Sequence, residues 1–121
     1  MSDRYAKDTF WQKYAADAKA LECTPREYKA GAARLNSLGP MRLLHATLGI
    51  ASEAGELVDA VKKYVFYGAE LDEVNLVEEI GDLQWYIATM LDELEVTMNE
   101  VLEKNIRKLL KKERRILEGD E

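Results

Sequence analysis

Two stretches of the chain decide its fold: Leu43–Leu57, which reads LLHATLGIASEAGEL, and Leu76–Ile87, which reads LVEEIGDLQWYI. In both stretches apolar residues recur at steps of three or four, the spacing of one face of an α-helix. The first pattern predicts a long helix over Met41–Phe66, and the second predicts a helix that ends near Glu95. Each of these helices carries an apolar stripe that can pack against another helix.

Capping residues mark the other helix boundaries. Two capping boxes, in which a threonine is followed three residues later by a glutamate, begin at Thr24 and Thr97. They predict helices that run to about Leu38 and to about Leu117. A further helix is expected over Asp8–Leu21, followed later by a break at Leu38-Gly39-Pro40. A loop is expected at Tyr67–Asp72, with Asp72 or Asn75 as the cap of the next helix. The last residues, Glu118–Glu121, are expected to form a frayed tail.

Length and composition indicate one all-α domain over residues 1–121. Of the 121 residues, 47% are apolar and 33% are charged, a balance that excludes a disordered or low-complexity chain. Strand signals are weak, and the helices with their short connections predict a four-helix-bundle-type core with an additional N-terminal helix. A bundle of this size buries more apolar surface when it pairs with a copy of itself, so we expect a homo-oligomer.

Charge and residue usage argue against several kinds of partner. The formal net charge of −6 disfavours binding to the phosphates of nucleic acid. The uncharged stretches Leu43–Ser52 and Leu83–Leu91 are shorter than the about 20 residues of a membrane-spanning helix. One cysteine, Cys23, excludes a disulfide framework within the chain, and the first residues lack the apolar core of a signal peptide. We therefore expect a cytoplasmic protein with no membrane or nucleic-acid partner.

Four carboxylates form the most informative pattern. Glu53 and Glu56 are three residues apart on one predicted helix, and Glu79 and Asp82 are three apart on the next. Residues at i and i+3 share a helix face, so each pair can present two carboxylates in one direction. All four border the apolar stripes, where charges need a partner. A divalent cation such as Mg²⁺, which prefers oxygen ligands, is one such partner, and a solvated acidic surface is the alternative.

The same residues resemble a known family. The order Glu53-x-x-Glu56 and then Glu79-x-x-Asp82, with Lys62-Lys63 and Phe66-Tyr67-Gly68 between them, is similar to the MazG-like all-α nucleoside-triphosphate pyrophosphohydrolases. The family signature is E-E-x-x-E followed by E-x-x-D, and Ser52 stands here in place of its first glutamate. The resemblance covers about residues 43–110.

The resemblance implies an activity and a cofactor. Family members hydrolyse nucleoside triphosphates, often deoxynucleotides, to the monophosphate and pyrophosphate, and many are dimers or tetramers. By carry-over, Mg²⁺, with Mn²⁺ as a substitute, would be held by Glu53, Glu56, Glu79 and Asp82, and Glu53 or Glu78 would accept the proton of the attacking water. The implied role is trimming or cleansing of a nucleotide pool, and an alarmone or a modified nucleotide is the alternative substrate within this class.

Five further residues are candidates for contacts with a nucleoside-triphosphate substrate. Four of them also have a purely structural interpretation: partial exposure beside helix packing at Gly49 for His45, a core position for Trp85, and a solvated basic surface for Asn105 and Lys108 on the last helix. Lys63 lies two turns from Glu56, a position suited to a phosphate contact. The candidates are Lys63, Asn105, Lys108, His45 and Trp85.

A different class of function remains open at this point. The chain is alternatively a non-catalytic helical module for oligomerisation or for adaptor binding, with its acids as surface decoration. Activity of variants at Glu53 and Asp82 separates the two interpretations, because an adaptor would not change when these carboxylates are neutralised.

Overall fold

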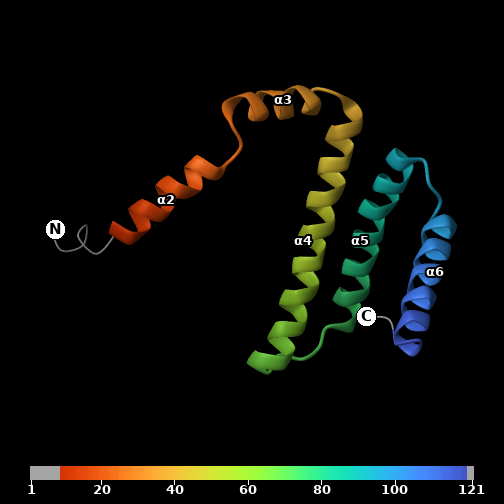
Figure 1. The fold of residues 1–121 in the computed structure, drawn as a ribbon. Coiled ribbons are helices and arrows are strands. Elements are labelled where there is room, and N and C mark those ends of the chain that lie inside the picture. Colours follow the sequence, from red (N-terminus) through yellow and green to blue (C-terminus); the bar gives the residue numbers. More distant parts are fainter. Residues whose placement is uncertain (1–8, 120–121) are drawn as a thin grey trace. The chain divides into compact units, whose positions relative to one another are not determined.

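The computed structural model describes residues 9–119, and these residues are 86% helical, with five helices and no strand. The predicted all-α class is therefore confirmed. The start of the first expected helix at Asp8 and the last two residues of the expected tail lie outside the described residues. The helices, labelled in Figure 1, are α2 (Thr9–Leu21), α3 (Pro25–Leu35), α4 (Leu38–Tyr67), α5 (Glu73–Leu94) and α6 (Met98–Leu117).

The chain divides into two compact units, one that ends at Ser37 and one that begins at Leu38. The first unit contains α2 and α3. Its predicted capping box is present: the Glu27 amide donates to the Thr24 hydroxyl at 3.2 Å, and the Thr24 amide donates to the Glu27 carboxylate at 2.6 Å. The helix that it starts ends at Leu35, about three residues earlier than expected, where the Asn36 amide donates back into the last turn.

The predicted break at Leu38-Gly39-Pro40 is wrong, because α4 begins at Leu38 and contains both Gly39 and Pro40 in its first turn. A proline is tolerated there, since an amide in the first turn of a helix has no intrahelical acceptor to lose. A Cβ at Gly39 would lie 2.5 Å from a carboxylate oxygen of Glu93 on α5, the end of a flexible side chain that can move aside, so this position does not require glycine. Two residues that usually interrupt helices therefore belong to the start of α4.

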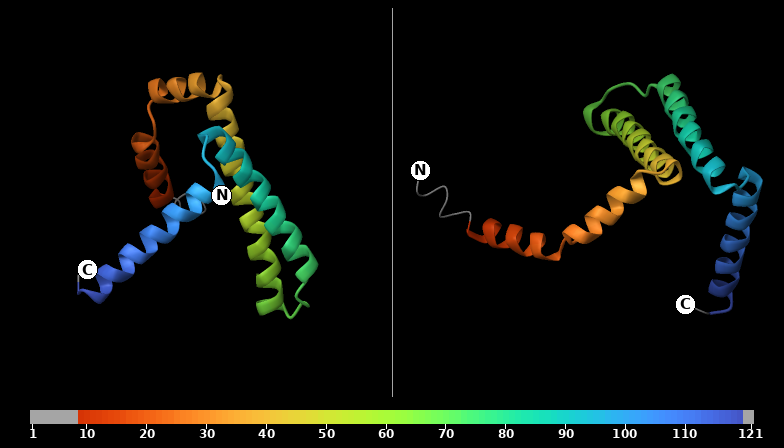
Figure 2. Two further views of the ribbon diagram at one scale, coloured as in Figure 1. Left: turned by 90° about the vertical axis from the view of Figure 1, so that its right-hand side faces the viewer. Right: turned by 90° about the horizontal axis from the view of Figure 1, so that it is seen from above.

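Helices α4 and α5 form a helical hairpin and pack against each other (Figure 1, and the left view of Figure 2). The loop at 68–72 turns the chain with Gly68 in a left-handed conformation, φ 69°, and the Asp72 carboxylate caps α5 by accepting from the Asn75 amide at 3.0 Å. At the other end, the Arg42 guanidinium contacts Asp92 and Glu93, each at 2.7 Å. These contacts fix both ends of the hairpin.

The tightest packing of the hairpin lies near its middle. Ala46 is fully buried, and Gly49, one turn further along α4, is the other buried residue of that helix. A Cβ at Gly49 would overlap the ring of Tyr86 on α5. Small residues on α4 thus allow α5 to approach closely at this level.

A larger side chain at Ala46 should destabilise the α4–α5 hairpin. We expect Ala46→Leu to lower the free energy of unfolding by about 1–3 kcal/mol, because added methylenes in filled space force side chains and backbone to shift. Urea denaturation followed by circular dichroism measures the effect. Ala51→Leu on the exposed side of α4 is the matched control and should change the stability little. Equal losses in both variants would contradict the close packing at Ala46.

Helix α6 begins with the second predicted capping box, in which the Glu100 amide donates to the Thr97 hydroxyl at 3.1 Å. Its apolar stripe remains exposed: Leu102 is 56% and Ile106 is 52% accessible to solvent. Among residues 9–119, no helix combines the length and the apolar character needed to span a bilayer.

Candidate metal centre

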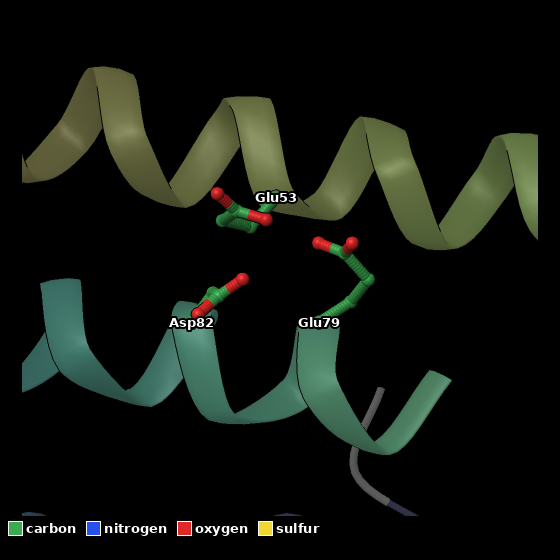
Figure 3. A group of neighbouring side chains, drawn as sticks. All are labelled: Glu53, Glu79 and Asp82. Atoms are coloured by element: carbon green, nitrogen blue, oxygen red, sulfur yellow. The ribbon is translucent and has the colours of Figure 1, made fainter. Parts of the chain in front are cut away.

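Three carboxylates meet across the hairpin. Glu53 projects from α4, and Glu79 and Asp82 project from α5 toward it (Figure 3). One oxygen of each carboxylate lies within 4.8 Å of the others. The two helices therefore bring together the expected i, i+3 pair of α5 and the first glutamate of the pair on α4.

The structure places Glu56 outside this group. The carboxylate oxygens of Glu53, Glu79 and Asp82 lie within 4.8 Å of one another, and Glu56 is not part of that group. It is exposed and lines a different cavity of about 240 Å³, which it shares with Asp59, Lys63 and Asn75, among other residues. The predicted pairs on the two helices thus do not meet as four carboxylates.

The electrostatics of the three-carboxylate group favour a proton or a cation. A hydrogen bond with the Glu53 carboxyl, partial burial, and the charges of Glu53 and Asp82 all raise the pKa of Glu79. None of the ion pairs found among residues 9–119 involves these three side chains. Carboxylate oxygens are also the donors that Mg²⁺ prefers, so the chemistry of the group fits such an ion.

The pKa of Glu79 gives a testable pH dependence. Because this pKa in the folded protein lies above its ordinary value of 4.5, protonated Glu79 stabilises the fold below that pH. This contribution is lost as the pH rises through the folded-state pKa. In EDTA, wild type should therefore lose stability relative to Glu79→Gln between pH 4.5 and neutral pH, as measured by urea unfolding. A difference that does not change with pH would contradict this electrostatic account.

Two aromatic side chains, Trp85 and Tyr86, lie next to the carboxylates. Glu53 and Asp82 line a cavity of about 260 Å³ together with Trp85 and Tyr86. In the single chain Trp85 is 64% exposed; it follows Asp82 by three residues and lines this cavity, so it is not part of the core within the hairpin. The Tyr86 ring lies edge-on to Trp85, with centroids 5.1 Å apart, and edge-on to the exposed His45 at 5.8 Å. Carboxylates and aromatic faces are thus available side by side.

The other sequence candidates lie apart from this cavity. The Lys63 ammonium contacts the Asp59 carboxylate at 2.7 Å, which lowers the pKa of Asp59 and raises that of Lys63. Glu78 is exposed beside Glu79, and Asn105 and Lys108 are exposed on α6. The substrate roles of Lys63, Asn105 and Lys108 and the catalytic role of Glu78 stay predictions.

Sequence reasoning missed Tyr86 as a residue of the site. A signal was present, because Tyr86 follows Asp82 by four residues and so lies one turn away on the same face of α5. The Asp59–Lys63 pair was also detectable, since oppositely charged residues at i and i+4 are neighbours on a helix.

Fold and site together define a class: an all-α protein with a carboxylate cluster suited to a divalent cation, next to an aromatic cavity. Comparison with known proteins is more specific. Residues 43–116 match the family described as the MazG nucleotide pyrophosphohydrolase domain, and the chain belongs to this family. It is also 33% identical over 85 residues to the Gene 37 protein of Mycobacterium phage L5, a match that covers 64% of this chain and 72% of that protein. No solved structure matches the chain significantly.

Proposed function

We propose that the chain hydrolyses nucleoside triphosphates, including deoxynucleotides, to the monophosphate and pyrophosphate in a Mg²⁺-dependent reaction that trims or cleanses a nucleotide pool. One observation carries this proposal: Glu53, Glu79 and Asp82 converge within 4.8 Å in a member of a nucleotide pyrophosphohydrolase family. Acids that served only as a solvated surface would not need to converge across two helices, since like charges repel.

The carboxylates supply the binding site for the ion in this proposal. Glu53, Glu79 and Asp82 hold Mg²⁺, or Mn²⁺ in its place, and Glu56 is the fourth ligand expected from the family pattern. When bound, the ion neutralises triphosphate charge and lowers the pKa of the attacking water. Glu53, or Glu78 beside the cluster, accepts the proton of that water.

The aromatic cavity supplies the substrate contacts that lie nearest to the carboxylates. Trp85 offers an exposed indole face, on which stacking of a nucleobase is worth about 1–3 kcal/mol. His45 borders the same aromatic group through its edge-on contact with Tyr86. Lys63, Asn105 and Lys108 are the candidate partners of the phosphates and the sugar.

We also propose that the working form is a homodimer or homotetramer. Ala46 is the one fully buried apolar residue among those described, while α4, α5 and α6 expose many large apolar side chains. Exposed apolar surface of this extent marks an interaction site in a stable protein. Two α4–α5 hairpins from two copies supply the four helices of the expected bundle.

The test of the activity is pyrophosphate release from a panel of ribo- and deoxynucleoside triphosphates, with Mg²⁺ and with EDTA. We expect pyrophosphate only when Mg²⁺ is present, and the panel ranks the substrates in the same experiment. Orthophosphate as the product would place the cleavage at another bond and reject the proposed reaction. No release from the panel, together with no binding of Mn²⁺, would favour the adaptor class of function.

A further inference from the structure

Among the glycines of α4 and α5, Gly49 is the one whose added Cβ would come closest to another side chain, the ring of Tyr86. Gly49 is buried, and a Cβ built on it would overlap ring atoms Cγ, Cδ1 and Cε1 of Tyr86. By contrast, a Cβ at Gly55 or at Gly81 on the same two helices would meet nothing within 4 Å. The middle of the Tyr86 ring, rather than a flexible chain end, therefore occupies the space that any larger residue at 49 would need.

This contact lies one helical turn from Glu53 on α4 and from Asp82 on α5, and about two turns from Glu79. Gly49 precedes Glu53 by four residues on α4, and Tyr86 follows Asp82 by four on α5, so about 6 Å of helix separates contact and cluster. The Tyr86 ring also lines the carboxylate cavity and is bracketed by the edges of His45 and Trp85. A shift of α5 away from α4 at Gly49 is consequently carried to Glu53 and Asp82.

We propose that Tyr86, seated on Gly49, is a positioning residue that sets the separation of α4 and α5 at the carboxylate cluster and thereby its affinity for a divalent cation. The inference rests on the proposed function, because it presupposes that the cluster binds a metal. Its physical basis is geometric: Mg²⁺ requires oxygens at about 2.0–2.1 Å in a near-octahedral arrangement, so small changes of helix separation matter. Mutual repulsion of the carboxylates makes a fixed spacer necessary in the metal-free protein.

The test is the affinity for Mn²⁺, measured on the full chain by electron paramagnetic resonance, with thermal unfolding in EDTA recorded for every variant. Gly49→Ala adds one methyl group under the ring, and Gly55→Ala adds the same group to open space on the same helix. Tyr86→Phe retains the ring, whereas Tyr86→Ala removes it. Residues that only orient metal ligands typically contribute 10–100-fold to metal affinity, so Gly49→Ala and Tyr86→Ala should weaken Mn²⁺ binding about tenfold or more.

Gly55→Ala and Tyr86→Phe should keep the wild-type Mn²⁺ affinity. Folded Gly49→Ala protein with wild-type affinity would overturn the inference, because the contact would then serve packing alone. Loss of affinity in Tyr86→Phe would also overturn it, since the hydroxyl and not the ring would be responsible. If Gly49→Ala and Tyr86→Ala both fail to fold, the contact serves the stability of the fold, and the proposed role in metal affinity is rejected. Absence of Mn²⁺ binding by wild type would instead reject the metal site of the proposed function itself, and the inference with it.

Discussion

Glu53→Gln should reduce Mg²⁺-dependent pyrophosphate release at least about 100-fold, because even groups that merely orient metal ligands contribute 10–100-fold. Glu53 is the member of the cluster that α4 contributes, and glutamine keeps its size while removing its charge. The metal-free variant should be as stable as wild type or more stable, since one of three mutually repelling carboxylates is neutralised. Steady-state pyrophosphate assays and urea unfolding in EDTA measure the two effects.

Asp82→Asn on α5 should give the same pattern of lost activity and retained fold. Glu103→Gln is a matched control, because Glu103 is an exposed glutamate on α6 whose carboxylate pairs with Arg107 at 3.6 Å. It should leave activity near the wild-type level. Activity retained by both Glu53→Gln and Asp82→Asn would reject the cluster as the metal site and favour a non-catalytic role.

Ile106→Glu should shift the proposed oligomer to monomer and raise its dissociation constant at least about 100-fold, because an unpaired charge in an apolar interface is costly. Ile106 lies in the exposed apolar stripe of α6 and is 52% accessible in the single chain, so the substitution does not disturb a buried core. Size-exclusion chromatography with light scattering, over a range of protein concentrations, measures the change.

The control for the assembly is Lys104→Glu, two residues away and on the opposite side of α6. It introduces the same side chain into the polar face and should leave the oligomer intact. A wild-type chain that is monomeric at all concentrations would reject the proposed assembly. Equal dissociation of the oligomer by both variants would show that the change in net charge, and not the apolar stripe of α6, causes the dissociation.

Local signals predicted most of the helices. The capping boxes at Thr24 and Thr97 depend on side chains three residues apart, and the structure contains both. The start of α4 was predicted wrongly, because the rule that Gly-Pro interrupts helices does not apply in a first turn.

The candidate site was predictable to the extent that it depends on helix geometry. The spacing of Glu79 and Asp82 predicts that both lie on one face of α5. The closest contacts of α4 fall on the small residues Ala46 and Gly49, which a pattern of large apolar side chains does not mark. Which carboxylate of α4 joins the cluster depends on how the two helices meet, and the structure brings Glu53, and not Glu56, within 4.8 Å of Glu79 and Asp82. The exposure of Trp85 likewise depends on what packs around it, which periodicity alone does not contain.

The hairpin of α4 and α5 also has a kinetic consequence. All three clustered carboxylates lie in two consecutive helices joined by a short loop. The contacts that bring them together therefore join residues at modest sequence separation, and the entropic cost of closing the loop between them is small. This half of the molecule should form early during folding and without waiting for a partner. Association of copies through exposed faces is, by contrast, a bimolecular step whose rate depends on protein concentration. A nascent chain can therefore bring the three carboxylates together before any association with a second copy.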